Sequence, residues 1–263
     1  MTGRQRIICP NEPIDGVTNL CALAIMTKAP RAGQVKTRLT PPLTAEEAAT
    51  LNSCFLRDIS AAIGKASGEL ARGIGCYTPV GAEEEYRKIL PPDFQLIPQR
   101  TGAFGHRLAG AIEDLLAAGF NSVCLINSDS PTAPASIFAQ AAELLSSPND
   151  QLVLGPSEDG GYYLIGMKTL HPRLFEDIDW STDRVLAQTR TRASEIGLPI
   201  CLLRVCYDVD DRASLDRLCE ELLGPNESLD PEIAPATTEF LRAIVAREGC
   251  QRIWSGAPSM PAQ

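Results

Sequence analysis

Short apolar runs of strand length alternate with helical segments along most of this chain, and this alternation constrains the fold more than any other feature. Each run is followed by a stretch that contains Pro, Gly or Asp. The runs lie at residues 20–26, 73–78, 94–97, 122–126, 152–154, 162–167 and 201–207. Strands that alternate with helices of ten or more residues indicate a mostly parallel sheet covered by helices on both faces. We therefore predict an α/β fold.

The segments between these runs have apolar residues at helical spacing. Thr44 and Glu47 form a capping-box sequence, which predicts a helix that begins there and runs to about residue 63. Ser181 is expected to cap a helix that ends near Gly197. The other helices are expected at residues 106–118, 136–146, 213–223 and 239–247.

No internal repeat and no shift in composition divides the chain into two domains. We expect one domain over residues 20–249. Residues 1–19 contain Pro and Gly without periodicity and are expected to form a flexible leader, and residues 250–263 a C-terminal tail.

The composition of the 263 residues excludes some classes of partner. A formal net charge of −9 argues against a nucleic-acid-binding surface, which needs Lys and Arg to neutralise phosphates. No run of about 18 apolar residues predicts a membrane span, and residues 1–19 lack the apolar region of a secretory signal. Nine cysteines, an odd number without any Cys-x-x-Cys pair, fit a reducing cytoplasm.

A basic loop, residues 28–38, follows the first expected strand. Residues 20–45 contain four basic residues and no acidic one, which reverses the sign of the chain's net charge locally. Lys offers a mobile charge and Arg a fork of donors, so such a loop suits a polyphosphate. The anion-binding residues predicted in it are Lys28, Gly33, Lys36 and Arg38, with Gly33 permitting close backbone approach. The loop is not a Walker loop, and the alternative is an ordinary solvated basic loop.

Acidic residues follow two of the later strands. Asp129 comes directly after the strand at 122–126, and residues 208–211 read Asp-Val-Asp-Asp after the strand at 201–207. If the strands are parallel, these carboxylates and the basic loop meet at one edge of the sheet, where ligands bind in open α/β folds. Carboxylates and cations facing one crevice suit a metal–polyphosphate substrate. The alternatives are a turn at Asp129 and a helix N-cap within 208–211.

A loop at residues 155–163 reads Gly-Pro-Ser-Glu-Asp-Gly-Gly-Tyr-Tyr. It could approach a ligand through its glycines, or it could be a simple hairpin, because Asp-Gly is a strong hairpin signal. The two histidines, His106 and His171, have no spacing typical of a triad or zinc site. Trp180 could contact an acceptor or only anchor its loop.

Five motifs in this order resemble a known bacterial family. They are Ala-Ile-Met-Thr-Lys-Ala-Pro-Arg-Ala-Gly-Gln-Val-Lys-Thr-Arg-Leu at 24–39, Ser-Asp-Ser-Pro at 128–131, Asp-Gly-Gly-Tyr-Tyr-Leu-Ile-Gly at 159–166, Trp-Ser-Thr at 180–182 and Asp-Val-Asp at 208–210. The family is labelled glycosyltransferase A or radical-SAM/selenodomain-associated transferase. It belongs to the nucleotide-diphospho-sugar transferase superfamily. The resemblance covers residues 20–245 and implies a GT-A fold, a Rossmann-like three-layer α/β/α sandwich.

The resemblance also implies roles for single residues. Lys36 and Arg38 are similar to the basic loop that holds the triphosphate in 2-phospholactate and molybdenum-cofactor guanylyltransferases. Asp129 matches the metal-binding Asp of those enzymes. Residues 209–212 resemble a Val-Asn-Asp-Arg segment of uridylyltransferases, which points to Asp210 as a second ligand of Mg²⁺ or Mn²⁺. The Asp-Gly-Gly segment, Asp159, Gly160 and Gly161, resembles a loop near the acceptor. One departure is Gly-Ala-Phe-Gly at 102–105, where the family commonly has Gly-Asp-Leu-Gly.

Together the residues and the resemblance predict a metal-dependent transferase that uses a nucleotide-activated donor and a small-molecule acceptor. The predicted catalytic residues are Lys36, Arg38 and Asp129. Glycosyl transfer would release a nucleoside diphosphate, whereas nucleotidyl transfer would release pyrophosphate. A third possibility, of another class, is a nucleotide-binding module without catalysis.

Overall fold

The computed structural model describes residues 5–10, 12–224, 230 and 232–255, and its centre is a seven-stranded sheet. The strand order is β3-β2-β1-β4-β6-β5-β7, and only β6 runs antiparallel to its neighbours. The strands are β1 Cys21–Lys28, β2 Ala71–Thr78, β3 Gln95–Pro98, β4 Ser122–Ile126, β5 Leu152–Pro156, β6 Tyr162–Met167 and β7 Ile200–Leu202. The α/β fold with a mostly parallel sheet is therefore confirmed.

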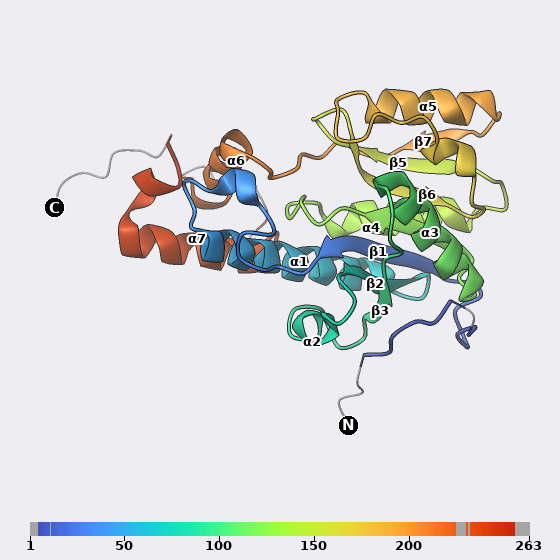
Figure 1. Ribbon diagram of the computed structural model, residues 1–263, viewed down its shortest axis with the longest axis horizontal. Helices are drawn as coiled ribbons and strands as arrows, with labels where there is room; N and C mark the ends of the chain where they lie inside the picture. Colours follow the sequence, from blue (N-terminus) through green and yellow to red (C-terminus); the bar gives the residue numbers. More distant parts are fainter. Residues whose placement is uncertain (1–4, 11, 225–229, 231, 256–263) are drawn as a thin grey trace.

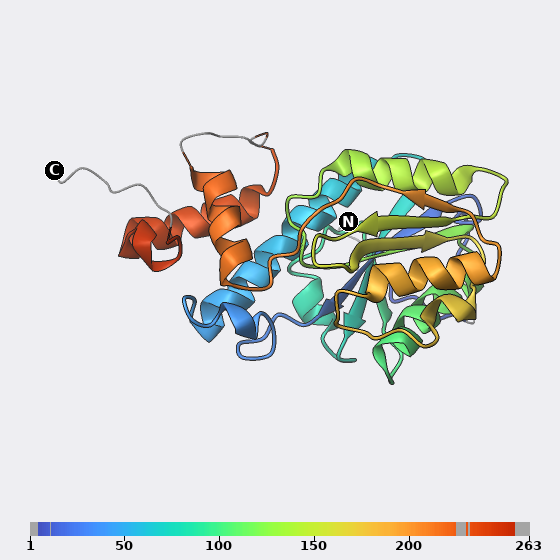
Figure 2. The same cartoon turned by 90° about the horizontal axis from the view of Figure 1, so that it is seen from above.

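Helices cover both faces of this sheet, as Figure 2 shows with α4 on one side and α5 on the other. One apolar cluster packs α1 and α4 against the first face, and a second packs α3 and α5 against the opposite face. The expected three-layer α/β/α sandwich is present. The helices of these layers are α1 Ala45–Ser67, α2 Glu83–Tyr86, α3 Phe104–Ala117, α4 Ala135–Ser146 and α5 Val185–Glu195, with the 3-10 turn η2 Pro172–Phe175 between β6 and α5.

The order of the strands creates a switch point between β1 and β4. From β1 the chain crosses to β2 and β3 on one side, and it then returns to form β4 on the other side of β1. Loops that follow two such strands diverge and leave a crevice at their carboxyl ends, which is where open α/β sheets bind ligands. The loop after β1 contains Lys36, and the loop after β4 contains Asp129.

A helical lobe extends from this edge of the sheet (Figure 1). The amino-terminal half of α1 enters the lobe and packs there through Leu51 and Phe55, while the rest of α1 lies against the sheet. A third apolar cluster, separate from those of the sheet, holds the lobe together. The other elements of the helical lobe are η1 Thr37–Leu39, α6 Arg212–Leu223, α7 Pro235–Glu248 and η3 Cys250–Arg252.

Several predicted boundaries agree with the structure, and two do not. Thr44 caps α1 in the expected box, with its hydroxyl accepting from the Glu47 N–H and the Glu47 carboxylate accepting from the Thr44 N–H. Ser181 does not cap α5, which begins at Val185 after Arg184; Ser181 instead has a φ of 65° in the loop before it. The strand expected at 201–207 ends at Leu202, and beyond it only an isolated bridge joins Cys206 to the loop after β5.

The predicted leader and tail are packed wherever the structure describes them. Ile8, Ile14 and Val17 are buried in the cluster under α3, and the N–H of Ile8 donates to the carbonyl of Leu96. The prediction of a flexible leader is therefore wrong for residues 5–10 and 12–19. This segment has no helical or strand periodicity, but its single apolar side chains are still buried in the core. Ile253 and Trp254 are likewise buried in the helical lobe, which corrects the tail over residues 250–255. Residues 1–4, 11 and 256–263 lie outside the described residues.

All nine cysteines are free; Cys124 is buried and Cys201 is half-buried. Within the described ranges, every helix is too short or too polar to cross a membrane.

Candidate active site

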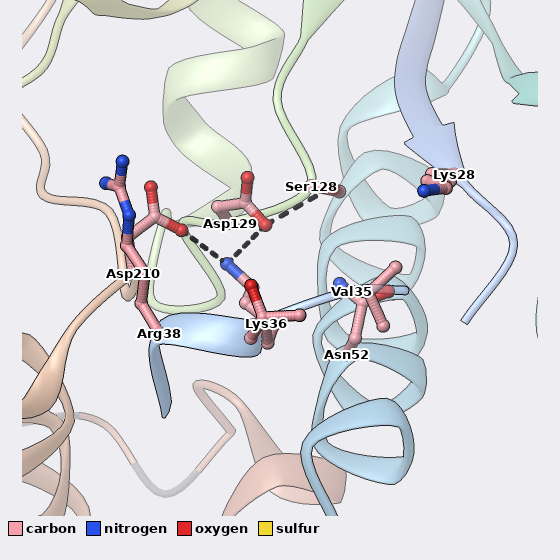
Figure 3. Close-up of a pocket in the computed structure, with 9 residues that line it drawn as sticks. Lys28, Val35, Lys36, Arg38, Asn52, Ser128, Asp129 and Asp210 are labelled. Carbon is pink, nitrogen blue, oxygen red and sulfur yellow. Dashed lines mark hydrogen bonds and ion pairs between the residues drawn. The ribbon is translucent and has the colours of Figure 1, made fainter. Parts of the chain in front are cut away.

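Three segments that are distant in the sequence meet at the switch point, and the side chain of Lys36 joins them (Figure 3). Its ammonium lies 2.5 Å from Oδ1 of Asp129 and 2.8 Å from Oδ1 of Asp210. It also donates to the carbonyl of Val209 at 2.8 Å. The Val209 N–H in turn donates to the carbonyl of Asp129 at 2.9 Å. The basic loop, the loop after β4 and the entry to α6 thus form one connected site.

Lys36 is held in a conformation suited to this contact. Its backbone is left-handed, with φ 50° and ψ 36°, immediately before η1. Only 4% of its side chain is exposed, and its ammonium lies 5.3 Å from the ring centroid of Phe55 on α1. Burial alone would lower the pKa of Lys36, but the charges of Asp129 and Asp210 outweigh it and raise the pKa. Lys36 is therefore a charged lysine inside the site.

Asp208 is a half-buried carboxylate at the same edge. Its Oδ1 accepts hydrogen bonds from Asn127 Nδ2 at 2.8 Å and from Ser130 Oγ at 2.6 Å. Within the described residues, Asp208 accepts no other side-chain hydrogen bond. Burial, opposed by the Ser130 bond and assisted by the negative charges of Asp129 and Asp159, raises the pKa of Asp208 to about 6. The predicted N-cap in this segment is Asp211, which accepts from the N–H of Ser214 at the start of α6.

Two cavities meet at these residues. The smaller, of about 260 Å³, has three basic side chains in its wall. Its lining is Lys28, Val35, Lys36, Thr37, Arg38, Asn52, Ser128, Asp129 and Asp210. The larger, of about 590 Å³, shares Arg38, Ser128, Asp129 and Asp210 with it and extends over the ends of β4 and β6 toward Trp180.

Asn52 is a member of the smaller cavity that the sequence reasoning missed. It projects from α1, is 3% exposed, and its Oδ1 has no hydrogen-bond partner. A buried amide without partners costs free energy unless a ligand satisfies it. The one signal in the sequence was a polar residue three positions before Phe55 on the apolar face of a predicted helix.

Two loops form the far wall of the larger cavity. One is the tip of the β5–β6 hairpin, and the other is the segment 180–185. Gly160 has a φ of +87°, and a Cβ there would lie 2.2 Å from the carbonyl oxygen of Asp183, so glycine is needed where the loops touch. The hairpin predicted for residues 155–163 is thus confirmed. Because β5 is parallel to β4, the tip of this hairpin lies at the same edge of the sheet as Asp129.

An aromatic pair also lines the larger cavity. The rings of Phe104, the first residue of α3, and Trp180 meet edge to face with centroids 5.1 Å apart. A Cβ at Gly105 would lie 2.9 Å from Nε1 of Trp180, so this glycine allows the indole to approach α3 closely. Trp180 both anchors its loop and lines the cavity.

Asp129 and Asp210 are suited to bind a divalent cation that is also coordinated by the phosphates of a substrate. Asp129 and Asp210 already share one cation, the ammonium of Lys36. Mg²⁺ is typically held by one or two carboxylates, with substrate phosphates and water completing its shell. Within the described part of the chain, no three His, Cys, Asp or Glu side chains gather closely enough to hold a metal by themselves. The donor set therefore suits a metal–phosphate complex and not an all-protein metal centre.

Most of the predicted site residues lie together. Lys28, Lys36, Arg38, Asp129 and Asp210 line the smaller cavity, and Asp159 and Gly161 line the larger one. Gly33 and Gly160 do not line either cavity. The histidines are outside the site, and His171 contacts Asp150 instead.

Comparisons with known proteins agree with this architecture. Residues 66–182 match a family described as an uncharacterized protein conserved in bacteria, DUF2064. A candidate nucleotide-diphospho-sugar transferase from Desulfovibrio desulfuricans G20 is 26% identical, with a TM-score of 0.75, over 87% of this chain and 97% of that chain. No curated protein matches the chain.

Two remoter structures have the names of a synthetase and a cytidylyltransferase. CMP:2-keto-3-deoxy-manno-octonic acid synthetase, in complex with CTP, is 10% identical over 76% of this chain and 96% of its own, with a TM-score of 0.49. A cytidylyltransferase from Leptospira borgpetersenii serovar Hardjo-bovis is 10% identical over 91% and 99%, with a TM-score of 0.47. The Desulfovibrio match, with the DUF2064 match, supports the nucleotide-diphospho-sugar transferase superfamily that the motifs suggested. The narrower family stays a prediction.

Proposed function

We propose that the chain is a metal-dependent transferase that acts on a nucleotide-activated donor. The observation that carries this proposal is the convergence of Asp129 and Asp210 on Lys36, between two cavities that share both carboxylates. A cation-rich cavity beside a larger one suits a donor whose phosphates bind in the first and an acceptor that binds in the second. The similarity to a candidate nucleotide-diphospho-sugar transferase supports the proposed class of reaction.

In this proposal Lys28, Lys36 and Arg38 bind the donor phosphates in the smaller cavity. Asp129 and Asp210 would hold Mg²⁺ or Mn²⁺, which supplies Lewis-acid stabilisation of phosphate charge when bound. Lys36 and Arg38 neutralise the negative charge that develops on the leaving phosphate. The chain contributes positioning and electrostatic stabilisation and forms no covalent intermediate.

Glycosyl transfer is the first reaction to test, because it is the activity suggested by the name of the Desulfovibrio protein. Nucleotidyl transfer is the second candidate, because three basic side chains in a cavity of about 260 Å³ also suit a triphosphate. The two differ in the product that they release. A nucleoside diphosphate would indicate glycosyl transfer, and pyrophosphate would indicate nucleotidyl transfer.

The experiment incubates the protein and Mn²⁺ with nucleotide sugars or nucleoside triphosphates and a panel of small-molecule acceptors, and analyses the products by ion-exchange chromatography. Asp129→Asn is the test variant, and Asp150→Asn, whose carboxylate pairs with His171 outside the site, is its control. We expect turnover in the wild type and control only. Metal-independent nucleotide binding without turnover would favour a binding module instead.

A further inference from the structure

We propose that the larger cavity takes an acceptor that is neutral or cationic and rich in hydroxyl or amino groups, such as a sugar or an amino sugar, and that it rejects anions. The inference rests on the proposed function, since it treats this cavity as the acceptor side of a transferase. It adds the chemical class of the acceptor, which the motifs leave open.

The charges in the cavity wall carry the inference. Five Asp side chains and one basic side chain, Arg38, line the cavity of about 590 Å³. Lys36 binds two of these carboxylates from the smaller cavity, and Arg38 is shared between the cavities. The remaining three, Asp159, Asp183 and Asp208, form no ion pair within the described residues. An anion placed among these three carboxylates would be repelled by their charge, which is unfavourable in a partly enclosed site.

The same carboxylates are suited to hydroxyl and amino donors. Ionised carboxylates only accept hydrogen bonds, and bonds to charged groups are the stronger ones. Both bonds to Asp208 reach Oδ1, which leaves Oδ2 for a ligand. Asp159 uses Oδ1 to accept from the N–H of Gly161 and likewise keeps its other oxygen. A ligand with several donors could bind both carboxylates at once.

Another part of the lining suits an apolar ring face. Phe104 and Trp180 present an edge-to-face pair, and Met26 and Leu108 also line the cavity. Phe104 is 42% exposed, unusually much for a phenyl group at the start of a helix. Pockets that combine aromatic surface with a few convergent polar groups bind molecules with one apolar and one polar side. Sugars have this character, because their C–H faces are apolar and their rims bear hydroxyls.

Hydrogen bonds and an ion pair hold the two loops that carry Asp159 and Asp183 in place. The Leu186 N–H donates to the carbonyl of Gly160 at 2.9 Å, which joins the two loops of the far wall. Glu158 pairs with Arg217 of α6 at 2.7 Å, which ties the hairpin tip to the helical lobe. Asp159 and Asp183 are therefore held on structured loops, and the negative wall exists before any ligand binds.

Tryptophan fluorescence can test the inference directly. The chain has two tryptophans, and Trp254 is buried in the helical lobe, so Trp254→Phe leaves Trp180 as the single reporter in the cavity. The probes are D-glucosamine, D-glucose and D-glucose 6-phosphate. Inorganic phosphate is present throughout to fill anion sites in the smaller cavity. Saturation-transfer NMR on the wild type provides the same ranking if the variant does not fold.

We expect glucosamine to bind most tightly, then glucose, with the phosphate ester weaker than glucose by about tenfold or more. Asp159→Asn keeps the bond from Gly161 and should reduce the preference for glucosamine over the phosphate ester several-fold. Asp150→Asn should leave it unchanged. Equal or tighter binding of the phosphate ester, or no binding of either sugar at millimolar concentrations, would overturn the inference.

The failures are distinguishable. If nucleotides still raise the melting temperature with Mn²⁺ while the phosphate ester binds best, the acceptor inference alone is wrong. If nucleotides do not bind at all, the proposed function is wrong.

Discussion

The ammonium of Lys36 lies 2.5 Å from Oδ1 of Asp129, and it occupies the position between two carboxylates where the proposed metal ion would bind. In the proposed reaction, Asp129 and Asp210 would hold the divalent cation and Lys36 would bind the donor phosphates. The metal would then compete with Lys36 for the two carboxylates.

Replacing Lys36 by Met should raise the affinity for Mn²⁺ in the absence of nucleotide, by roughly tenfold or more, because a competing cation is removed. Electron paramagnetic resonance of free Mn²⁺ measures this directly. Arg38→Met is the matched control, since Arg38 is exposed and forms no ion pair with Asp129 in the described chain. Equal Mn²⁺ affinities in the two variants would show that Lys36 does not compete with the metal.

Asp129→Asn should leave the fold intact and abolish metal-dependent turnover. The side chain of Asp129 is 30% exposed, and Lys36 keeps Asp210 and the Val209 carbonyl as partners. We expect turnover to fall by about 10²-fold or more, since electrostatic stabilisation of phosphate charge is lost. Product formation and the circular dichroism melting curve provide the two readouts. An active Asn variant would exclude Asp129 as a metal ligand.

Asn52→Leu tests whether the unpartnered amide belongs to the donor site. Nucleotide affinity should fall by about two- to tenfold, the typical value of one neutral hydrogen bond, because the amide oxygen would accept from a hydroxyl or amino group of the donor. The melting temperature should stay the same or rise, because a buried polar atom without a partner is removed. Isothermal calorimetry and thermal melting of the same samples measure both. A lower melting temperature with unchanged nucleotide affinity would assign Asn52 a structural role only.

The sequence could predict the parts of this site that follow from strand order. Parallel strands bring their carboxyl ends to one edge, so the alternation of strands and helices was enough to place Asp129 beside the basic loop. Asp210 came from motif resemblance. Asn52 could not be predicted, because it comes from the side of a helix and not from a strand end. Lys36 and Asp210 are 174 residues apart, and no local pattern predicts such a contact.

The helical lobe shows a similar limit. Its helices were predicted from periodicity, but the cluster that they build with the first half of α1 could not be, because apolar spacing does not identify the packing partner. The N-cap of α1 was predicted correctly, because a capping box is a local sequence pattern. The cap of α7, in contrast, comes from another helix.

Asp58 on α1 provides this cap. Its carboxylate accepts from the N–H groups of Ala236 and Thr237 at 2.9 Å each and from the Thr237 hydroxyl at 2.6 Å. Asp58→Ala leaves these donors buried without a partner and should lower the free energy of unfolding by about 2–4 kcal/mol. Chemical denaturation measures the change, with the exposed Asp93→Ala as control. Similar midpoints for the two variants would contradict the role of Asp58.

Glu47 links α1 to the end of the lobe and should make stability depend on pH. The hydrogen bond from Arg252, opposed by burial and helped by the Thr44 N–H, lowers the pKa of Glu47 below its ordinary value of 4.5. The ionised form therefore favours folding. Its contribution is complete above pH 4.5 and is lost as the pH falls through the pKa of the folded state.

Glu47→Gln should accordingly lower the free energy of unfolding by about 1 kcal/mol at neutral pH. The difference from the wild type should shrink as the pH falls below 4.5 and disappear once Glu47 is protonated in the folded state. Gln can still accept the capping bond from Thr44, so the helix start is preserved. A difference that stays constant between neutral and acidic pH would show that the charge of Glu47 is not what stabilises the lobe.

Metal-dependent binding of a nucleotide-activated donor is tested best by a thermal-shift measurement with a panel of nucleotides and nucleotide sugars, with and without Mn²⁺, on the wild type and Asp129→Asn. We expect at least one of these ligands to raise the melting temperature of the wild type only when Mn²⁺ is present. Chelator or Asp129→Asn should remove the shift. A panel in which no nucleotide changes the melting temperature, or in which the shift persists without metal and in the Asn variant, would contradict the proposed role of the site.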